Sequence, residues 1–216
     1  MINPRVIAIL AALSTCVLGM DVAAIAAEPA EQMVIDGYRG AKFGMSDKEV
    51  RGAIKKDFDI RDPADDVNDV ERTKVLTITV KALLPDAPPA QISYILGASS
   101  SKLMQVNVVW GGEPGGGELR QLVSVANTLR GYFIDRGGYA EGSTVVNKTL
   151  ADGSVLVFRG ADAKGHMVVL HLLPIVQPTA GESKGSPPAA TKGVLRLSYV
   201  EQPGKPDVFH IEKGQF

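Results

Sequence analysis

The chain has 216 residues, enough for one domain or two small lobes, and 45% of them are apolar, which is ample for a buried core. Lysine and arginine together number 23, against 24 aspartates and glutamates, so the formal net charge is −1. This balance provides no general attraction to a polyanion, and we expect no nucleic-acid partner.

The amino end predicts a secretory signal peptide over residues 1–27. Arg5 precedes an apolar run that continues through Met20, and small residues lead up to Ala27. A retained membrane anchor would need about 20 uninterrupted apolar residues, and Asp21 interrupts this run. We therefore expect cleavage near Ala27 and a periplasmic protein whose mature chain has no transmembrane segment.

Cys16 is the only cysteine and offers an alternative to this cleavage. Residues 13–16 loosely resemble a lipoprotein cleavage box, which would make Cys16 a lipidated first residue, although the threonine before it fits that pattern badly. Cleavage after Ala27 would leave a mature chain without cysteine. Such a chain can form no disulfide, thiol nucleophile or cysteine metal site.

The first half, residues 28–111, is expected to begin with a loose leader over 28–34 and an extended approach over 35–43. Ser46 stands three residues before Glu49, a spacing that predicts a capping box and a helix over about 47–57. Val50, Ile54 and Phe58 recur every fourth residue, so one stripe of this helix must pack against other residues.

Residues 57–71 are rich in aspartate but lack the glycine and the spaced glutamate of an EF-hand loop, which favours a solvated connection over a calcium site. Strands are expected over 74–84, 91–96 and 103–110. A glycine-rich connector over 112–117 follows them. It matches neither phosphate-loop pattern, so it predicts a flexible link.

The second half, residues 118–200, opens with a predicted helix over 118–136 that Gly137 and Gly138 end. Asp152 and Gly153 predict a hairpin turn between strands over 143–150 and 154–158. Further strands are expected over 166–173 and 194–200. Between them, residues 174–192 have the composition of a mobile loop, and residues 201–216 read as a weakly structured tail.

These elements predict an α+β fold in which two helices cover one face of an antiparallel sheet of about six strands. Each half places an amphipathic helix before a run of antiparallel strands. This shared order suggests, as a conjecture, that the two halves are similar.

The sequence predicts no catalytic residue, no metal ligand and no cofactor. His166 and His171 are five residues apart on one predicted strand and should point to opposite faces, and His210 lies in the tail. Ser99 lies in the run Gly-Ala-Ser-Ser-Ser at 97–101, which lacks the last glycine of G-x-S-x-G and occupies a hairpin turn.

Two further groups of side chains are not expected to form a functional site. Four polar residues near predicted hairpin ends could form a surface patch, but such ends are usually only solvated: Arg39, Lys42, Arg159 and Asp162. Trp110 and Tyr94 are expected in the core or at its rim, in preference to a ligand platform.

The run Phe43-Gly44-Met45-Ser46, with Glu49 and Val50 after it, resembles the Gly-Met-[ST]-x-x-[DE]-Val opening of small exported bacterial domains of the SmpA/BamE-like kind. The resemblance covers about a dozen residues. It implies a module of helices and antiparallel sheet that supports envelope assembly through protein contacts. It transfers no functional residue to this chain.

The leading functional hypothesis is therefore a non-catalytic, periplasmic protein-interaction or envelope-assembly module, whose edge strands could accept a partner. The alternative is a periplasmic binder of a small molecule or envelope fragment, with its site in the groove between the two halves. A hydrolase is a third hypothesis that no motif supports.

Overall fold

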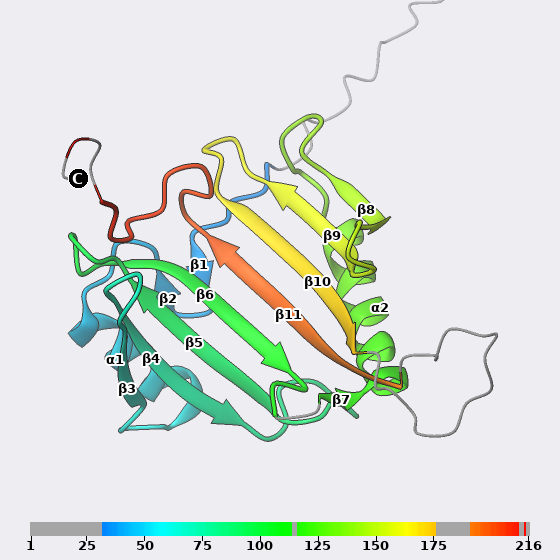
Figure 1. The fold of residues 1–216 in the computed structure, drawn as a ribbon, viewed down its shortest axis with the longest axis horizontal. Helices are drawn as coiled ribbons and strands as arrows, with labels where there is room; N and C mark the ends of the chain where they lie inside the picture. The colour runs from blue at the N-terminus through cyan, green and yellow to red at the C-terminus, as the bar shows by residue number, and fades with distance from the viewer. Residues whose placement is uncertain (1–31, 114–115, 176–190, 212–213, 215–216) are drawn as a thin grey trace, which may run out of the picture. The chain divides into compact units, whose positions relative to one another are not determined.

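The structure of the protein, a computed structural model, describes residues 32–113, 116–175, 191–211 and 214 (Figure 1). The predicted signal peptide, Cys16 and the start of the predicted leader lie outside the described residues, as do most of the predicted loop over 174–192 and part of the tail. Those predictions stay predictions. In the described part, no helix combines the length and the apolar character needed to cross a bilayer.

The helix α1 (Asp47–Phe58) begins where the sequence predicts it, and the capping box between Ser46 and Glu49 is present. Oε2 of Glu49 accepts hydrogen bonds from the backbone N–H of Ser46 at 2.8 Å and from its hydroxyl at 2.6 Å. The predicted stripe is also confirmed, since Val50 and Ile54 are fully buried. The helix ends at Asp59, which adopts a left-handed backbone conformation with φ of 56°.

Within the described residues, the main sheet has nine strands, and the path through eight of them runs β3-β4-β5-β6-β11-β10-β9-β8 (Figure 1). Every pairing in it is antiparallel. In chain order, the strands are β3 (Ala64–Asn68), β4 (Thr73–Val80), β5 (Ala90–Leu96), β6 (Leu103–Trp110), β7 (Gly117–Glu118), β8 (Val145–Thr149), β9 (Val155–Ala161), β10 (Met167–Ile175) and β11 (Lys192–Val200). The short strand β7 pairs with β11 beside this path.

Both helices pack on one face of the sheet, as predicted. In Figure 1, they lie behind the strands, α1 on the β3–β4 side and α2 (Leu119–Arg136) on the β9–β10 side. The buried side chains of α2, among them Leu122, Ala126 and Phe133, recur at helical spacing and meet the buried positions of β9, β10 and β11. The core therefore lies between the helices and this face.

A separate two-stranded sheet, β1 (Gly37–Tyr38) and β2 (Ala41–Lys42), covers the middle of the same face. It contacts β6 and β11, the two strands at the centre of the sheet, and the Tyr38 and Tyr199 rings meet at 5.4 Å. Only glycine fits at position 37, where φ is 138° and an added Cβ would lie 2.1 Å from the carbonyl oxygen of Ala41. The hairpin thus fills the space that the two helices leave open.

The prediction of about six strands is wrong, since the residues that the structure describes already give the main sheet nine. The acidic segment, expected to be a solvated connection throughout, contains the exposed edge strand β3, whose Asp65 pairs with Arg51 and Lys74. The hairpin β1–β2 and the strand β7 are too short for their side-chain pattern to predict them.

Several predicted boundaries also shift. The strand expected over 74–84 ends at Val80, because its partner β5 begins at Ala90, and the next residues leave the sheet to pack on the core. Strand β10 continues through Pro174 and Ile175, and β11 begins at Lys192, so both extend into the predicted loop over 174–192.

The tail has no helix or strand in its described residues, as expected of a weakly structured segment, yet it makes specific contacts. The carbonyl oxygen of Asp207 accepts from the backbone N–H of Ala98 at 2.9 Å. Its carboxylate accepts from the backbone of Ser99 and Ser100 at 3.1 and 2.8 Å. The tail is therefore fastened to the β5–β6 turn, where Ser99 has a structural role.

Candidate functional site

Asp152, Ser154 and His171 form a polar cluster at the turn between β8 and β9. The hydroxyl of Ser154 donates to Oδ1 of Asp152 at 2.6 Å and lies 2.8 Å from Nε2 of His171. The backbone N–H of Ser154 donates to the same carboxylate oxygen at 3.0 Å. Serine therefore stands between the other two groups, whereas an acyl-transfer triad needs histidine in the middle.

The surroundings of this cluster indicate a turn-stabilising role. Ser154 is only 4% exposed, so its hydroxyl is not open to a substrate. Hydrogen bonds from Ser154 lower the pKa of the Asp152 carboxyl, and burial lowers the pKa of His171. The cluster thus consists of an ionised carboxylate and a neutral imidazole that share one buried hydroxyl.

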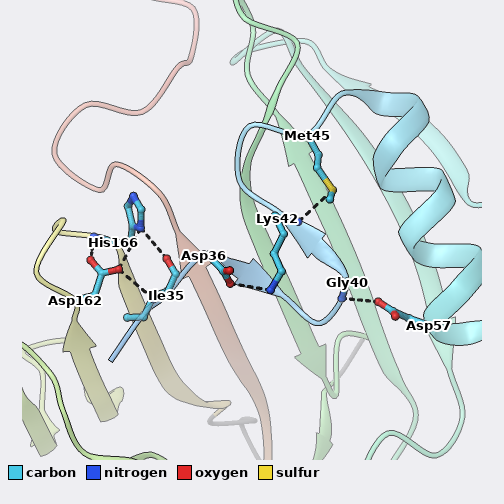
Figure 2. Close-up of polar contacts among 8 residues, drawn as sticks. All are labelled: Ile35, Asp36, Gly40, Lys42, Met45, Asp57, Asp162 and His166. Atoms are coloured by element: carbon cyan, nitrogen blue, oxygen red, sulfur yellow. Dashed lines mark hydrogen bonds and ion pairs between the residues drawn. The ribbon is translucent and has the colours of Figure 1, made fainter. Parts of the chain in front are cut away.

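Asp162 and His166 form a second polar cluster, which fastens the start of the described chain (Figure 2). Oδ2 of Asp162 accepts from the backbone N–H of Ile35 at 3.0 Å, and Oδ1 accepts from the backbone of Lys164 and His166 at 2.9 and 3.0 Å. Nδ1 of His166 lies 2.7 Å from the carbonyl oxygen of Ile35. The carboxylate and the imidazole both serve as anchors for the backbone at Ile35.

This arrangement argues against the surface patch that Arg39, Lys42, Arg159 and Asp162 could have formed, which the sequence did not favour. Asp162 is only 3% exposed and is enclosed by its own hydrogen bonds. Lys42 pairs with Asp36 at 2.8 Å, as Figure 2 shows, while Arg39 lies over the ring of Phe58. The four residues do not form one exposed group.

The prediction that His166 and His171 share one strand is wrong, because β10 begins at Met167 and His166 lies in the turn before it. The two histidines have separate partners, since His166 binds the backbone at Ile35 and His171 binds Ser154. His210 is exposed in the tail. Among the residues that the structure describes, no three histidine, cysteine, aspartate or glutamate side chains are grouped so that they could hold a metal ion.

A cavity of about 190 Å³ lies on the helix side of the sheet, where the two halves meet. We call it the aromatic cavity, because four of its side chains are tyrosine or tryptophan and a fifth is phenylalanine. Its walls come from the hairpin β1–β2, the segment after β4, the helix α2 and the central strands β6 and β11. The lining residues are Tyr38, Arg39, Leu83, Leu84, Trp110, Leu129, Tyr132, Phe133, Leu197 and Tyr199.

The side chains around the aromatic cavity have few polar groups, and in the described structure two of these groups lack an ordinary partner, a hydrogen-bond acceptor for one and a carboxylate for the other. Trp110 is 1% exposed, and its indole N–H is buried without a hydrogen-bond partner in the described structure. The exposed guanidinium of Arg39 lies 4.7 Å from the ring centre of Phe58 and 5.8 Å from that of Tyr38. No carboxylate among the described residues pairs with it.

Two tyrosines in the wall of this cavity, Tyr38 and Tyr199, are neutral near pH 7. Burial raises the pKa of Tyr199 and of Tyr38, and at Tyr38 it outweighs the opposing effect of the neighbouring Arg39. The cavity therefore presents a single positive charge at its rim and the neutral phenols of Tyr38 and Tyr199 in its wall.

Sequence reasoning placed Trp110 and Tyr94 in the core or at its rim, and both are buried. It did not single out Tyr38, Tyr132 or Tyr199, which come from three distant parts of the chain. The sequence offered one hint at Arg39. It follows Tyr38, and Gly37 and Gly40 flank this pair in a short stretch before the first helix, as is typical of a tight turn. No spacing rule connects these positions, so only the folded chain brings them together.

The chain matches no protein-family model, and comparisons with curated proteins and with solved structures also found no match. The SmpA/BamE-like resemblance therefore remains a prediction. Any proposal about function depends on the residues and geometry described above.

Proposed function

We propose that this protein is a non-catalytic interaction module of the cell envelope, which binds a partner protein on the sheet face opposite its helices. The single observation that supports this proposal is the composition of that face, here called the open face. No described helix or strand lies in front of it in Figure 1. Its centre is a row of short polar side chains across four strands: Thr77, Ser93, Asn107 and Ser198.

The flanking positions of the open face are suited to a protein partner. Val75, Ile95 and Val200 are partly exposed on it, and the side chains that alternate onto it between β4 and β10 include no aspartate or glutamate. Arg196 supplies a positive charge. Mixed apolar and neutral polar surfaces with few charges are typical of the centre of protein interfaces, and Arg196 favours an acidic rim on the partner.

The sheet edges are less suitable for a partner than the sequence suggested. Both edge strands, β3 and β8, have five residues, and β3 carries Asp65 and Asp66. In β8, Asn147 has a φ of 51° and falls out of the pairing with β9. Short, charged and interrupted edges resist strand addition, so we propose the open face as the docking surface instead.

We further propose that the two halves are structural repeats. In each half, a helix precedes four strands that pair in sequence order, and the last strands, β6 and β11, pair with each other at the centre. A twofold relation between the halves would account for this palindromic order. The open face would then be a continuous platform built from both repeats.

The test is site-specific photo-cross-linking in envelope extract. A photoreactive phenylalanine analogue replaces Asn107 on the open face or, as the control, Lys55 on the exposed side of α1. We expect a discrete protein adduct only from position 107, and we expect Arg196→Glu to weaken it while Arg61→Glu, at an exposed site elsewhere, does not. Equal adducts from both positions, or none from the folded protein, would contradict the proposal.

Export to the periplasm and cleavage near Ala27 are part of the same proposal. The intact mass of the protein from the envelope fraction tests both, since a mature chain beginning at Glu28 differs from a lipidated chain beginning at Cys16. Recovery of the full-length chain from the cytoplasm would contradict export.

A further inference from the structure

We propose that the aromatic cavity binds a small aromatic monocarboxylate, with the ring inside the cavity and the carboxylate on Arg39. This site lies on the helix side of the sheet, opposite the open face, so the inference does not rest on the proposed protein partner. Two observations lead to it: the size and aromatic lining of the cavity, and the guanidinium at its rim, which pairs with no carboxylate in the described structure.

The aromatic cavity is open to solvent on one side, where Tyr132 is exposed, and its volume indicates how much of an occupant it can hold. An engineered cavity of about 150 Å³ in another protein holds one benzene molecule. The 190 Å³ here therefore fit one six-membered ring with a short substituent. Tyr38, Tyr132 and Phe133 come from two separate elements and provide ring edges and faces, which favour an aromatic guest over an aliphatic one of equal size.

The charge of the cavity determines the second part of the ligand. Arg39 presents a planar guanidinium that pairs with no carboxylate in the described structure and rests against the rings of Phe58 and Tyr38. A guanidinium binds a carboxylate through two parallel hydrogen bonds, a geometry that a neutral amide cannot match. The occupant should therefore be an anion.

The backbone at Arg39 is left-handed, with a φ of 52° at a hairpin turn that usually has glycine or asparagine in this conformation. Five other non-glycine residues of the described chain share it, so it does not by itself mark a site. An arginine there places its side chain at the rim of the cavity at some cost to the turn.

The indole of Trp110 lies in the wall of the cavity and serves as a reporter of its occupancy. Its N–H is fully buried, so it is not a donor that the occupant can reach. Because Trp110 is the only tryptophan in the chain, both its fluorescence and its single indole N–H resonance report on this cavity alone.

The experiment uses the full mature chain with phenylacetate as the probe, phenylacetamide as its neutral counterpart, and acetate as the anion without a ring. We expect phenylacetate to shift the Trp110 fluorescence and the indole N–H resonance and to raise the melting temperature. Phenylacetamide should bind more weakly than phenylacetate by a factor of about ten. Acetate should leave the fluorescence and the N–H resonance of the indole unchanged.

Two variants and a matched control locate the site. Arg39→Gln should lower the affinity for phenylacetate to that for phenylacetamide, whereas Arg61→Gln should leave both unchanged. Leu84→Phe, in the irregular segment at the cavity wall, should fill the cavity and abolish binding of both probes while far-UV circular dichroism stays native. The inference is overturned by equal affinity for acid and amide, by undiminished binding in Leu84→Phe, or by an indole signal that no probe moves.

Discussion

At the scale of single residues, Asp162 shows how one buried carboxylate joins distant parts of the chain. It accepts hydrogen bonds from Ile35, near the start of the described chain, and from the turn that leads into β10. Asp162 is almost completely buried, and so is the N–H of Ile35 that it accepts from, so water cannot easily replace that bond if the carboxylate is removed. The anchoring of the amino-terminal segment therefore depends on this side chain.

Replacing Asp162 by alanine should destabilise the protein by about 3 kcal/mol, because one buried and two partly buried backbone N–H groups lose their acceptor. Urea denaturation measures this change. Asp69→Ala, in the exposed turn after β3, is the matched control and should change the free energy of unfolding by less than about 0.5 kcal/mol. Equal effects of the two substitutions would contradict the anchoring role.

His171 should make stability depend on pH between about 7 and 5. Burial and, to a smaller degree, Arg196 lower its pKa below the ordinary value of 6.5, while Asp152 opposes the shift. As the pH falls through 6.5, His171 is protonated in the unfolded chain, whereas it is still neutral in the folded protein. The stability present above that pH is therefore lost on acidification.

The measurement is the free energy of unfolding at pH 7 and pH 5. Wild-type protein should lose stability over this interval, and His171→Gln should lose less. His210→Gln, in the exposed tail, should behave as wild type. Hydrogen bonds from Ser154 are the main cause of the lowered pKa of Asp152, so this carboxylate stops contributing to stability only at more acidic pH. It therefore does not affect the comparison between pH 7 and pH 5. An unchanged pH dependence in His171→Gln would refute this account.

At the scale of elements, α1 and α2 are well predicted because their signals are local. The Ser46–Glu49 capping box spans three residues, and the apolar stripes repeat within each helix. Strand β3 was missed because its signal is not local. Its exposed residues show no apolar alternation, and it is held by pairing with β4 and by the contacts of Asp65 with Arg51 and Lys74.

Gly52 lies in α1, and replacing it tests whether a residue with higher helix propensity stabilises the protein. An added Cβ there meets no atom within 4 Å, so Gly52→Ala should stabilise the protein by about 0.5–1 kcal/mol through the helix propensity of alanine. Gly37→Ala is the opposing control and should destabilise, because its Cβ would meet the carbonyl oxygen of Ala41. Thermal unfolding of both variants checks the pair, and a loss of stability in Gly52→Ala would contradict the prediction.

At the scale of the whole molecule, the pairing of β6 with β11 joins the two halves. Six consecutive residues of β11, Leu195 to Val200, pair with β6, and both strands contribute to one core. Separating the halves would expose Val108, Trp110 and Leu197 to water. The cost of exposing that apolar surface should keep the halves from unfolding independently.

We therefore expect a single cooperative unfolding transition. Trp110 lies in β6, next to both β5 and β11, so its fluorescence reports on the junction, whereas far-UV circular dichroism reports on all elements. The two signals should give the same urea midpoint. Two separate midpoints would indicate halves that fold as independent domains.

The sequence by itself determined the two helices, most of the long strands and the α+β class, because caps, turns and apolar periods act over a few residues. The tertiary structure alone decided the nine-stranded order, the meeting of β6 and β11 and the attachment of the tail through Asp207. It also decided the aromatic cavity, whose Arg39, Trp110 and Tyr132 lie far apart in the chain. Contacts between distant residues depend on how the elements pack, and no local pattern encodes that packing.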